Sequence, residues 1–210
     1  MKKLALLVYP AFSLQEVMNL SSLFLWHYEI ATEVLSTSLD PVKSEEGIVV
    51  LPQVTTDQFR TSDYQCLILP GCSDFTELCR DQKLLSFLQG FQGNSDFPIG
   101  AICGGPMLLA RAGLLRGRPF TASIYQEYFD ICPFLEREHF VAAPAVVSPP
   151  IVTAGGGNFN GFAVEMARLL GLPCRDRIFA GYMDQCTPED YLPHLPPEAL
   201  EEMTEMLGNW

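Results

Sequence analysis

Short apolar runs alternate along the chain with segments whose apolar residues recur every three or four positions. The runs predict strands at 3–9, 28–36, 46–55, 66–70, 97–103, 118–123 and 149–155. The amphipathic segments predict helices at 13–26, 81–92, 105–115 and 157–171. Apolar strands that alternate with helices favour a mostly parallel sheet covered on both faces. The pattern therefore predicts an α/β fold.

The pattern changes after about residue 173. The stretch "YLPHLPPEALEEMTEM" at 191–206 is rich in proline and then becomes acidic and helical. A chain of 210 residues suits a single domain. We therefore expect an α/β domain over 1–172 and, over 173–210, a C-terminal extension that packs on the same domain.

The ends of two helices carry recognisable signals. Ser13 and Glu16 have the spacing of a capping box, which predicts that Ser13 is the N-cap of the first helix. Pro106 falls in the first turn of the helix at 105–115, where its missing N–H costs nothing. Gly113 is expected to close that helix.

Charge and hydropathy exclude several classes of partner. The net charge is −12 at pH 7 and there is no basic tract, so binding to nucleic acid or to an anionic membrane is not expected. No apolar stretch approaches the ~18 residues of a membrane span. The apolar run after Lys2 and Lys3 stops at Pro10 without a small-residue cleavage site, which favours a first strand over a signal peptide. A cytoplasmic location is expected.

The cysteines show no pattern of metal ligation. There are seven, with irregular spacing and no C-x-x-C: Cys66, Cys72, Cys79, Cys103, Cys132, Cys174 and Cys186. We therefore expect no metal site and no cofactor, and we expect most of these residues to be small buried thiols.

Cys103 differs from the others because it ends a strand. Gly104 and Gly105 follow, and then a helix begins. Small residues at such a turn suit a nucleophile elbow, and a helix N-terminus lowers the pKa of a thiol. The N–H groups of Gly104 and of the Gly71–Cys72 loop are candidates for an oxyanion hole. From the residues alone, a buried structural cysteine beside a packing loop remains an equal alternative.

Four stretches together resemble one known family. "AICGGPMLLARAGLLRG" is similar to the cysteine elbow of the ThiJ/PfpI superfamily, which includes the Parkinsonism-associated deglycase. "LLVYPAFSLQEVM", "LILPGC" and "IVTAGGGNFNGFAVEMARLLG" resemble its other site segments, in the family order, over about residues 2–172. The resemblance implies a flavodoxin-like three-layer sandwich of the class I glutamine amidotransferase-like type. It also implies a homodimer, and exposed apolar stretches such as "FLWHY" are compatible with one.

The resemblance also implies roles for individual residues. It makes Cys103 the nucleophile and Glu16 the carboxyl group that hydrogen-bonds the cysteine sulfur. Gly71 and Cys72 take the oxyanion-loop positions, where the second residue is commonly glycine. The alternative for Glu16 is that it only caps its own helix.

Two histidine positions of the family are occupied by other residues. Ser123 stands where many members have a histidine, and Gly104 stands where proteolytic members often have one. His27, His139 and His194 are expected at the surface, so a conventional cysteine protease is not expected.

Two further stretches bear on the site. Thr187 replaces the histidine of a glutaminase-like stretch at 183–190, which disfavours a glutaminase triad. Gly155 and Gly156 belong to a turn that brings a helix close to the sheet and, with Ser123, are candidate pocket residues.

Two main functions follow from these residues. In the first, the Cys103 thiolate attacks a small electrophilic carbonyl or amide substrate and Glu16 carries the proton, as in a glyoxalase, deglycase, hydratase or amidase. In the second, the protein is a redox sensor or stress-response protein, and an oxidant converts Cys103 to a sulfinic acid that protonated Glu16 stabilises. A third possibility is a scaffold that binds a small ligand without chemistry.

Overall fold

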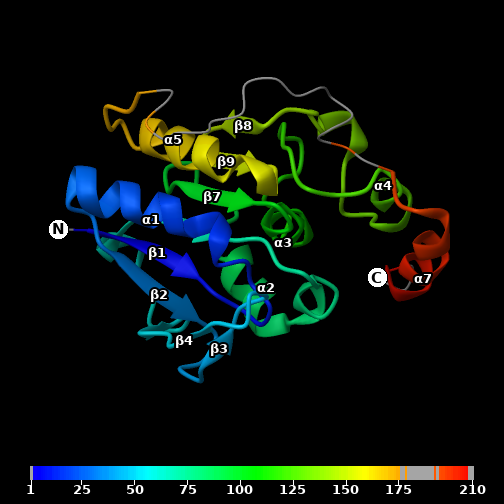
Figure 1. Ribbon diagram of the computed structural model, residues 1–210, viewed down its shortest axis with the longest axis horizontal. Coiled ribbons are helices and arrows are strands. Elements are labelled where there is room, and N and C mark those ends of the chain that lie inside the picture. The colour runs from blue at the N-terminus through cyan, green and yellow to red at the C-terminus, as the bar shows by residue number, and fades with distance from the viewer. Residues whose placement is uncertain (1, 176–177, 179–191, 193, 208–210) are drawn as a thin grey trace.

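A seven-stranded sheet forms the centre of the protein in the computed structural model, which describes residues 2–175, 178, 192 and 194–207 (Figure 1). The strand order is β5-β2-β1-β6-β7-β9-β8. All neighbouring strands pair in parallel except β8, which runs antiparallel to β9. The strands are β1 (Lys3–Leu7), β2 (Thr32–Ser36), β5 (Val54–Thr55), β6 (Tyr64–Leu69), β7 (Ile99–Ile102), β8 (Ala145–Ser148) and β9 (Ile151–Ala154).

Helices cover both faces of this sheet. The helices of the sheet domain are α1 (Gln15–Tyr28), α2 (Gln82–Gln89), α3 (Gly105–Arg111), α4 (Tyr128–Ile131) and α5 (Phe159–Leu169). α1 packs on α5, and α2 packs on α3. Right-handed crossovers place the two pairs on opposite faces, because the chain moves in opposite directions from β1 to β2 and from β6 to β7 (Figure 1). The expected flavodoxin-like sandwich is confirmed.

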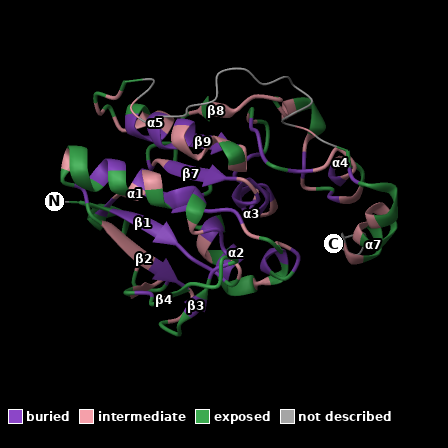
Figure 2. Ribbon diagram, in the orientation of Figure 1, coloured by how far each residue is buried: buried purple, intermediate pink, exposed green. Residues whose placement is uncertain are grey.

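The core lies along the central strands. β7 is buried throughout, and β1 and β6 each have only one residue that is not fully buried (Figure 2). Strands covered on both faces need near-continuous apolar sequence, and "LALL", "CLIL" and "IGAI" supply it. The rigid centre of the sheet therefore ends in the loops that carry the candidate site residues.

Two strand predictions need correction, and one strand of the main sheet was missed. The stretch 46–55 forms no single strand: β4 (Val49–Val50) pairs with β3 (Val42–Lys43) in a separate hairpin, and β5 joins the main sheet. Pro52 lies between β4 and β5, and a proline cannot donate a ladder hydrogen bond. The stretch 118–123 forms only one isolated bridge, between Phe120 and Phe140. The antiparallel strand β8 was not expected.

The start of the first helix also differs from the prediction. Leu14, and not Ser13, is the N-cap of α1, and no side chain of the helix itself caps it. The carboxylate of Glu46, which lies in the hairpin loop, accepts hydrogen bonds from the N–H groups of Leu14 (3.2 Å) and Gln15 (2.9 Å). The capping box is wrong because the Glu16 side chain is buried at the site and does not turn back to Ser13.

The remaining helix predictions hold with shifted ends. α3 ends at Arg111, and Gly113 follows with φ +80°, a conformation that glycine adopts without strain. The first predicted helix extends to Tyr28, so β2 begins later than expected.

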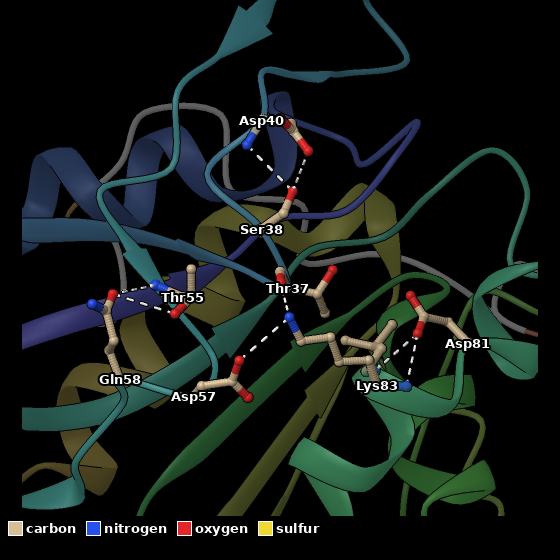
Figure 3. A network of polar contacts seen from close by, with 9 residues as sticks. Thr37, Ser38, Asp40, Thr55, Asp57, Gln58, Asp81 and Lys83 are labelled. Atoms are coloured by element: carbon tan, nitrogen blue, oxygen red, sulfur yellow. Dashed lines mark hydrogen bonds and ion pairs between the residues drawn. The ribbon is translucent and has the colours of Figure 1, made fainter.

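α2 begins in a network of polar contacts. The Asp81 side chain accepts hydrogen bonds from the N–H groups of Lys83 (2.9 Å) and Leu84 (3.1 Å). The Lys83 ammonium lies 3.4 Å from the Asp57 carboxylate and also donates to the Thr37 carbonyl (Figure 3). This network joins the start of α2 to the segments that follow β2 and β5.

The described part of the C-terminal region contains α7 (Pro197–Leu207), which lies near α4 (Figure 1). Its apolar side chains Ala199, Leu200, Met203 and Met206 pack against the core. His194 Nδ1 lies 3.1 Å from Glu127, and the Leu195 N–H donates to the same carboxylate at 2.8 Å. The stretch 183–190, with Thr187 and Cys186, lies outside the described residues, and the division at 172/173 stays a prediction.

Among the residues that the structure describes, no helix is both long and apolar enough to cross a membrane.

Candidate active site

The predicted site residues meet at the carboxyl ends of β1, β6, β7 and β9. β1 leads to Glu16 at the start of α1, β6 leads to Gly71, and β7 leads directly to Cys103. The strand order reverses between β1 and β6, and crevices at such a reversal are the usual ligand sites of open α/β sheets.

Cys103 lies in a sharp strand-to-helix turn. Its φ is +60°, a left-handed conformation that costs free energy for any residue other than glycine. Hydrogen bonds hold its backbone on both sides: its N–H donates to the Ala154 carbonyl (2.9 Å), and its carbonyl accepts from the Ser123 N–H (3.0 Å). Local strain held in place by neighbouring segments is typical of an elbow that presents a nucleophile.

Glu16 lies beside the Cys103 thiol. It belongs to the first turn of α1 and is only 8% exposed. Its Oε2 accepts a hydrogen bond from the Gly71 N–H at 2.6 Å, and its side chain is hydrogen-bonded to Cys103. The carboxyl group is thus held between the loop after β6 and the elbow.

Gly71 and Gly156 allow the two reactive side chains to lie this close to the backbone. A Cβ at position 71 would lie 2.5 Å from both Cys103 Cβ and Glu16 Oε2. A Cβ at position 156 would lie 2.7 Å from Glu16 Oε1 and 3.0 Å from Cys103 Sγ. Any side chain at either position would displace the Cys–Glu pair.

Burial changes the acidity of Glu16. Desolvation raises its pKa to about 7, although the hydrogen bonds with Cys103 and with the Gly71 N–H act in the opposite direction. The negative charges of Glu45 and Glu46 raise it further. Near neutral pH this carboxyl group is therefore divided between its acid and base forms, as a proton carrier requires.

The Cys103 thiol does not have the lowered pKa that the elbow predicted. Burial raises its pKa, and the charge of Glu16 and the hydrogen bond to it raise it further. The hydrogen bond from Ser123 and the Gly104 N–H lower it but do not compensate. The expected effect of the helix N-terminus is outweighed, so the resting site holds a thiol, and its reactivity depends on transfer of the proton to Glu16.

Ser123 contributes to the site in place of a histidine. Its hydroxyl accepts a hydrogen bond from the Gly156 N–H at 2.8 Å and interacts with the Cys103 sulfur. A Cβ at position 155 would lie 3.7 Å from the Ser123 hydroxyl, so Gly155 also borders the site. A hydroxyl group orients the sulfur but does not act as a base at neutral pH.

The oxyanion-hole prediction changes in one respect. The Gly71 N–H is already bonded to Glu16, so it is not free for a substrate oxygen. Within the described part of the chain, the Cys72 N–H has no hydrogen-bond acceptor, and it lies 3.6 Å from where a Gly104 Cβ would be. The Gly104 N–H is directed at the Cys103 sulfur. The Cys72 N–H is therefore the free candidate donor in the resting site, and the Gly104 N–H is a candidate only once the sulfur has given up this hydrogen bond to bond a substrate carbon.

The histidines have partners elsewhere. His139 Nε2 lies 3.6 Å from Glu136, and His194 pairs with Glu127. His27 is exposed at the end of α1. Neither His139 nor His194 is paired with a group of the site, and among the described residues Glu16 is the acid–base group that contacts the thiol.

The described residues contain six free cysteines and no cluster of His, Cys, Asp and Glu that would hold a metal ion. Cys186 lies outside them.

Sequence reasoning missed two residues beside the site. The buried Tyr9 hydroxyl donates to the Pro70 carbonyl, and burial raises its pKa, so it stays neutral beside Cys72, Glu16 and Cys103. The other is Glu46, which caps α1 from the hairpin loop. The turn residues of "SEEG" at 44–47 were the available signal for that loop.

Comparison with known proteins finds matches in one family. The model of the DJ-1/PfpI family matches residues 2–169. Protein/nucleic acid deglycase 2 of Escherichia coli is 31% identical over 123 residues, which are 58% of this chain and 70% of that protein. The isonitrile hydratase of Pseudomonas putida is 26% identical over 144 residues, 68% of this chain and 60% of the hydratase.

A solved structure shows the same fold. The DJ-1 superfamily protein Atu0886 of Agrobacterium tumefaciens superimposes with a TM-score of 0.72 at 21% identity, over 100% of this chain and 99% of that one.

Proposed function

Because the chain belongs to the DJ-1/PfpI family, we propose that it is a cysteine-dependent enzyme acting on small electrophilic carbonyl compounds, with 2-oxoaldehydes as the preferred class. The observation that carries the proposal is the contact between the Cys103 thiol and a buried carboxyl group whose pKa is about 7. The deglycase and the hydratase among its relatives support chemistry at an electrophilic carbon.

The first step joins the sulfur to the aldehyde carbon. As the S–C bond forms, the thiol proton passes to the Glu16 carboxylate and the carbonyl electron pair becomes an oxyanion. The N–H groups of Cys72 and Gly104 stabilise this charge. Glu16 then returns the proton to the oxygen, which gives a hemithioacetal.

Glu16 also serves the second stage. It takes the proton from the hemithioacetal carbon while the ketone oxygen receives the electron pair and a proton, which gives an enediol. A proton is then delivered to the neighbouring carbon and the first hydroxyl group gives up its own proton, which converts the adduct to a 2-hydroxy thioester. Water then hydrolyses the thioester, giving a 2-hydroxy acid and the free thiol. No amine leaving group has to be protonated, so a site without a histidine suffices; peptide hydrolysis would need an efficient acid at that atom.

Methylglyoxal consumption tests the proposal. We expect turnover by the wild-type protein, loss to the background rate in Cys103→Ser, and wild-type turnover in Cys174→Ser. Cys174 is a matched control because it is also a partly exposed free thiol and lies after α5, away from the site. Equal background rates for all three proteins would remove the glyoxalase function.

Redox sensing is the second candidate function. A Glu16 carboxyl group with a pKa of about 7 is partly protonated and able to donate a hydrogen bond to an oxidised sulfur. The raised pKa of the thiol opposes this function, because the thiolate is the form that peroxide oxidises. Mass spectrometry after mild peroxide treatment compares the two: sensing requires Cys103 to be oxidised in preference to Cys66 and Cys174.

A further inference from the structure

The loop between β3 and β4 carries a carboxylate that the proposed reaction does not use. The loop is a tight turn, in which the Gly47 N–H donates to the Ser44 carbonyl (3.0 Å) and the Ser44 N–H to the Ile48 carbonyl (2.8 Å). Gly47 has φ +87°. This geometry projects Glu45 and Glu46 from the end of the hairpin.

Backbone hydrogen bonds dock the hairpin on the segment that leads to α1. The Ala11 N–H donates to the Lys43 carbonyl, and the Glu45 N–H to the Phe12 carbonyl, both at 2.9 Å. The position of the loop relative to the start of α1 is therefore fixed by the main chain.

Glu46 completes the start of the helix. Its carboxylate accepts from the N–H groups of Gln15 (2.9 Å) and Leu14 (3.2 Å), and the Ser13 hydroxyl lies within 3.4 Å. Burial opposes ionisation, but the hydrogen bonds from the Gln15 N–H, the Ser44 hydroxyl, its own N–H and the Leu14 N–H lower the pKa of Glu46 to about 2. An anion that accepts the free N–H groups stabilises a helix N-terminus.

We propose that Glu46 is a positioning residue for the site: from the hairpin it holds the first turn of α1 and thereby keeps the carboxyl group of Glu16 against Cys103 and Gly71. Glu16 directly follows Gln15, whose N–H bonds to Glu46, so a shift of this turn moves Glu16. The proposal rests on the proposed role of Glu16 as the proton carrier.

The effect of Glu46 on the position of Glu16 can be separated from its effect through charge, because the loop holds a second carboxylate, Glu45. The titratable groups that face Glu16 come from the loops after β1, β6 and β7 and from the hairpin: Tyr9, Cys72, Cys103, Glu45 and Glu46. Both hairpin carboxylates raise the pKa of Glu16, but only the Glu46 side chain bonds to the start of α1. Glu45→Gln is therefore a matched control for charge alone.

The test is the pH dependence of Cys103 alkylation by iodoacetamide in the full chain, followed by mass spectrometry. In the wild type the alkylation rate should level off above about pH 7. Once Glu16 has lost its proton, the Cys103–Glu16 pair shares the one remaining proton, and the thiolate fraction no longer changes with pH. In Glu46→Ala the plateau should disappear, and the rate should rise about tenfold from pH 8 to pH 9, like that of a thiol titrating above this range.

Three further variants separate the causes. Glu46→Asp keeps the charge but is one methylene too short for both amides, so it should also lose the plateau. Glu46→Gln keeps an acceptor for only one of the two amides and sets its NH2 group against the other N–H, so it should lose the plateau as Glu46→Asp does. Glu45→Gln leaves the cap intact and should keep a plateau that begins at lower pH.

A plateau retained in Glu46→Ala or Glu46→Asp would overturn the proposal. Loss of the plateau in Glu45→Gln would overturn it as well, since charge alone would then be responsible. If Glu46→Ala does not fold, the contrast of Glu46→Asp with Glu45→Gln decides. Alkylation needs no substrate, so this result is independent of turnover, whereas failure of the proposed function appears as missing Cys103-dependent loss of methylglyoxal.

Discussion

The pairing of Cys103 with Glu16 shows how neighbouring groups decide the acidity of a thiol. An elbow at a helix N-terminus favours a thiolate, yet burial and the adjacent carboxylate raise the thiol pKa in this protein. The same burial raises the pKa of Glu16 to about 7. The pair therefore holds one proton above neutral pH, and its transfer between the two atoms is the basis of the proposed chemistry.

Burial of Glu16 has a consequence for stability. Its folded pKa of about 7 exceeds the ordinary value of 4.5, so its contribution is fully present below pH 4.5 and is lost as the pH rises through 7. Glu16→Gln removes this loss of stability at high pH, because a glutamine side chain does not ionise. We expect the variant to be more stable than the wild type at pH 8, by at most about 3 kcal/mol, and to differ little at pH 5.

Urea unfolding at both pH values measures this effect. A wild-type protein that is as stable as Glu16→Gln at pH 8 would show that the carboxyl group is not buried in its charged form.

Adjacent glycines provide a matched test of the close packing. Gly156→Ala places a Cβ 2.7 Å from Glu16 Oε1, so we expect at least a tenfold loss of Cys103-dependent turnover. Gly157→Ala has open space around its Cβ and should stay within about twofold of the wild type. Steady-state rates of methylglyoxal consumption by the two variants test whether Gly156 packs against the Cys103–Glu16 pair. Equal activity would contradict the packing of Gly156 against the pair.

The site residues were predictable from the sequence to the extent that they follow strands. Cys103 follows β7 directly, Gly71 and Gly156 come shortly after β6 and β9, and the ends of parallel strands converge at one edge of the sheet. Glu46 was not predictable as a cap, because its contact with Gln15 spans 31 residues and depends on a hairpin outside the main sheet. The raised pKa of the Cys103 thiol was also not predictable, because it depends on how deeply the side chain is buried.

At the scale of elements, the central strands and the long helices were predicted and the edges were not. β1, β6 and β7 are mostly apolar runs, whereas β4 and β5 have two residues each; β4 pairs with β3 in a hairpin, and β5 pairs with β2 across that hairpin. Short edge strands have too little periodicity to be recognised from a single sequence.

The N-cap of α2 gives a prediction for an element. Asp81→Ala removes the acceptor for the N–H groups of Lys83 and Leu84 and should lower the free energy of unfolding by about 1 kcal/mol. Chemical denaturation measures the loss. Asp96→Ala is the control, because its exposed carboxylate bonds only to the adjacent Ser95 among the described residues. Equal effects of the two substitutions would contradict the cap.

At the scale of the whole molecule, the outer surface of α1 is unusually apolar. Trp26 is 81% exposed, and Met18 and Leu25 of the same helix are about half exposed. Such side chains are enriched at protein–protein interfaces. We propose that α1 contributes to a homodimer.

Light scattering after size exclusion tests this assembly. The wild type should have about twice the mass of the 23.3 kDa chain, and Trp26→Glu should shift it towards the monomer. A monomeric wild type at micromolar concentration would contradict the dimer.

The pH profile of Cys103 alkylation in the wild type and in Glu16→Gln tests whether Cys103 and Glu16 share one proton. We predict a wild-type rate that levels off above about pH 7, and a Glu16→Gln rate that keeps rising through pH 9. Identical profiles for the two proteins, each that of a free thiol near pH ~8.5, would contradict it.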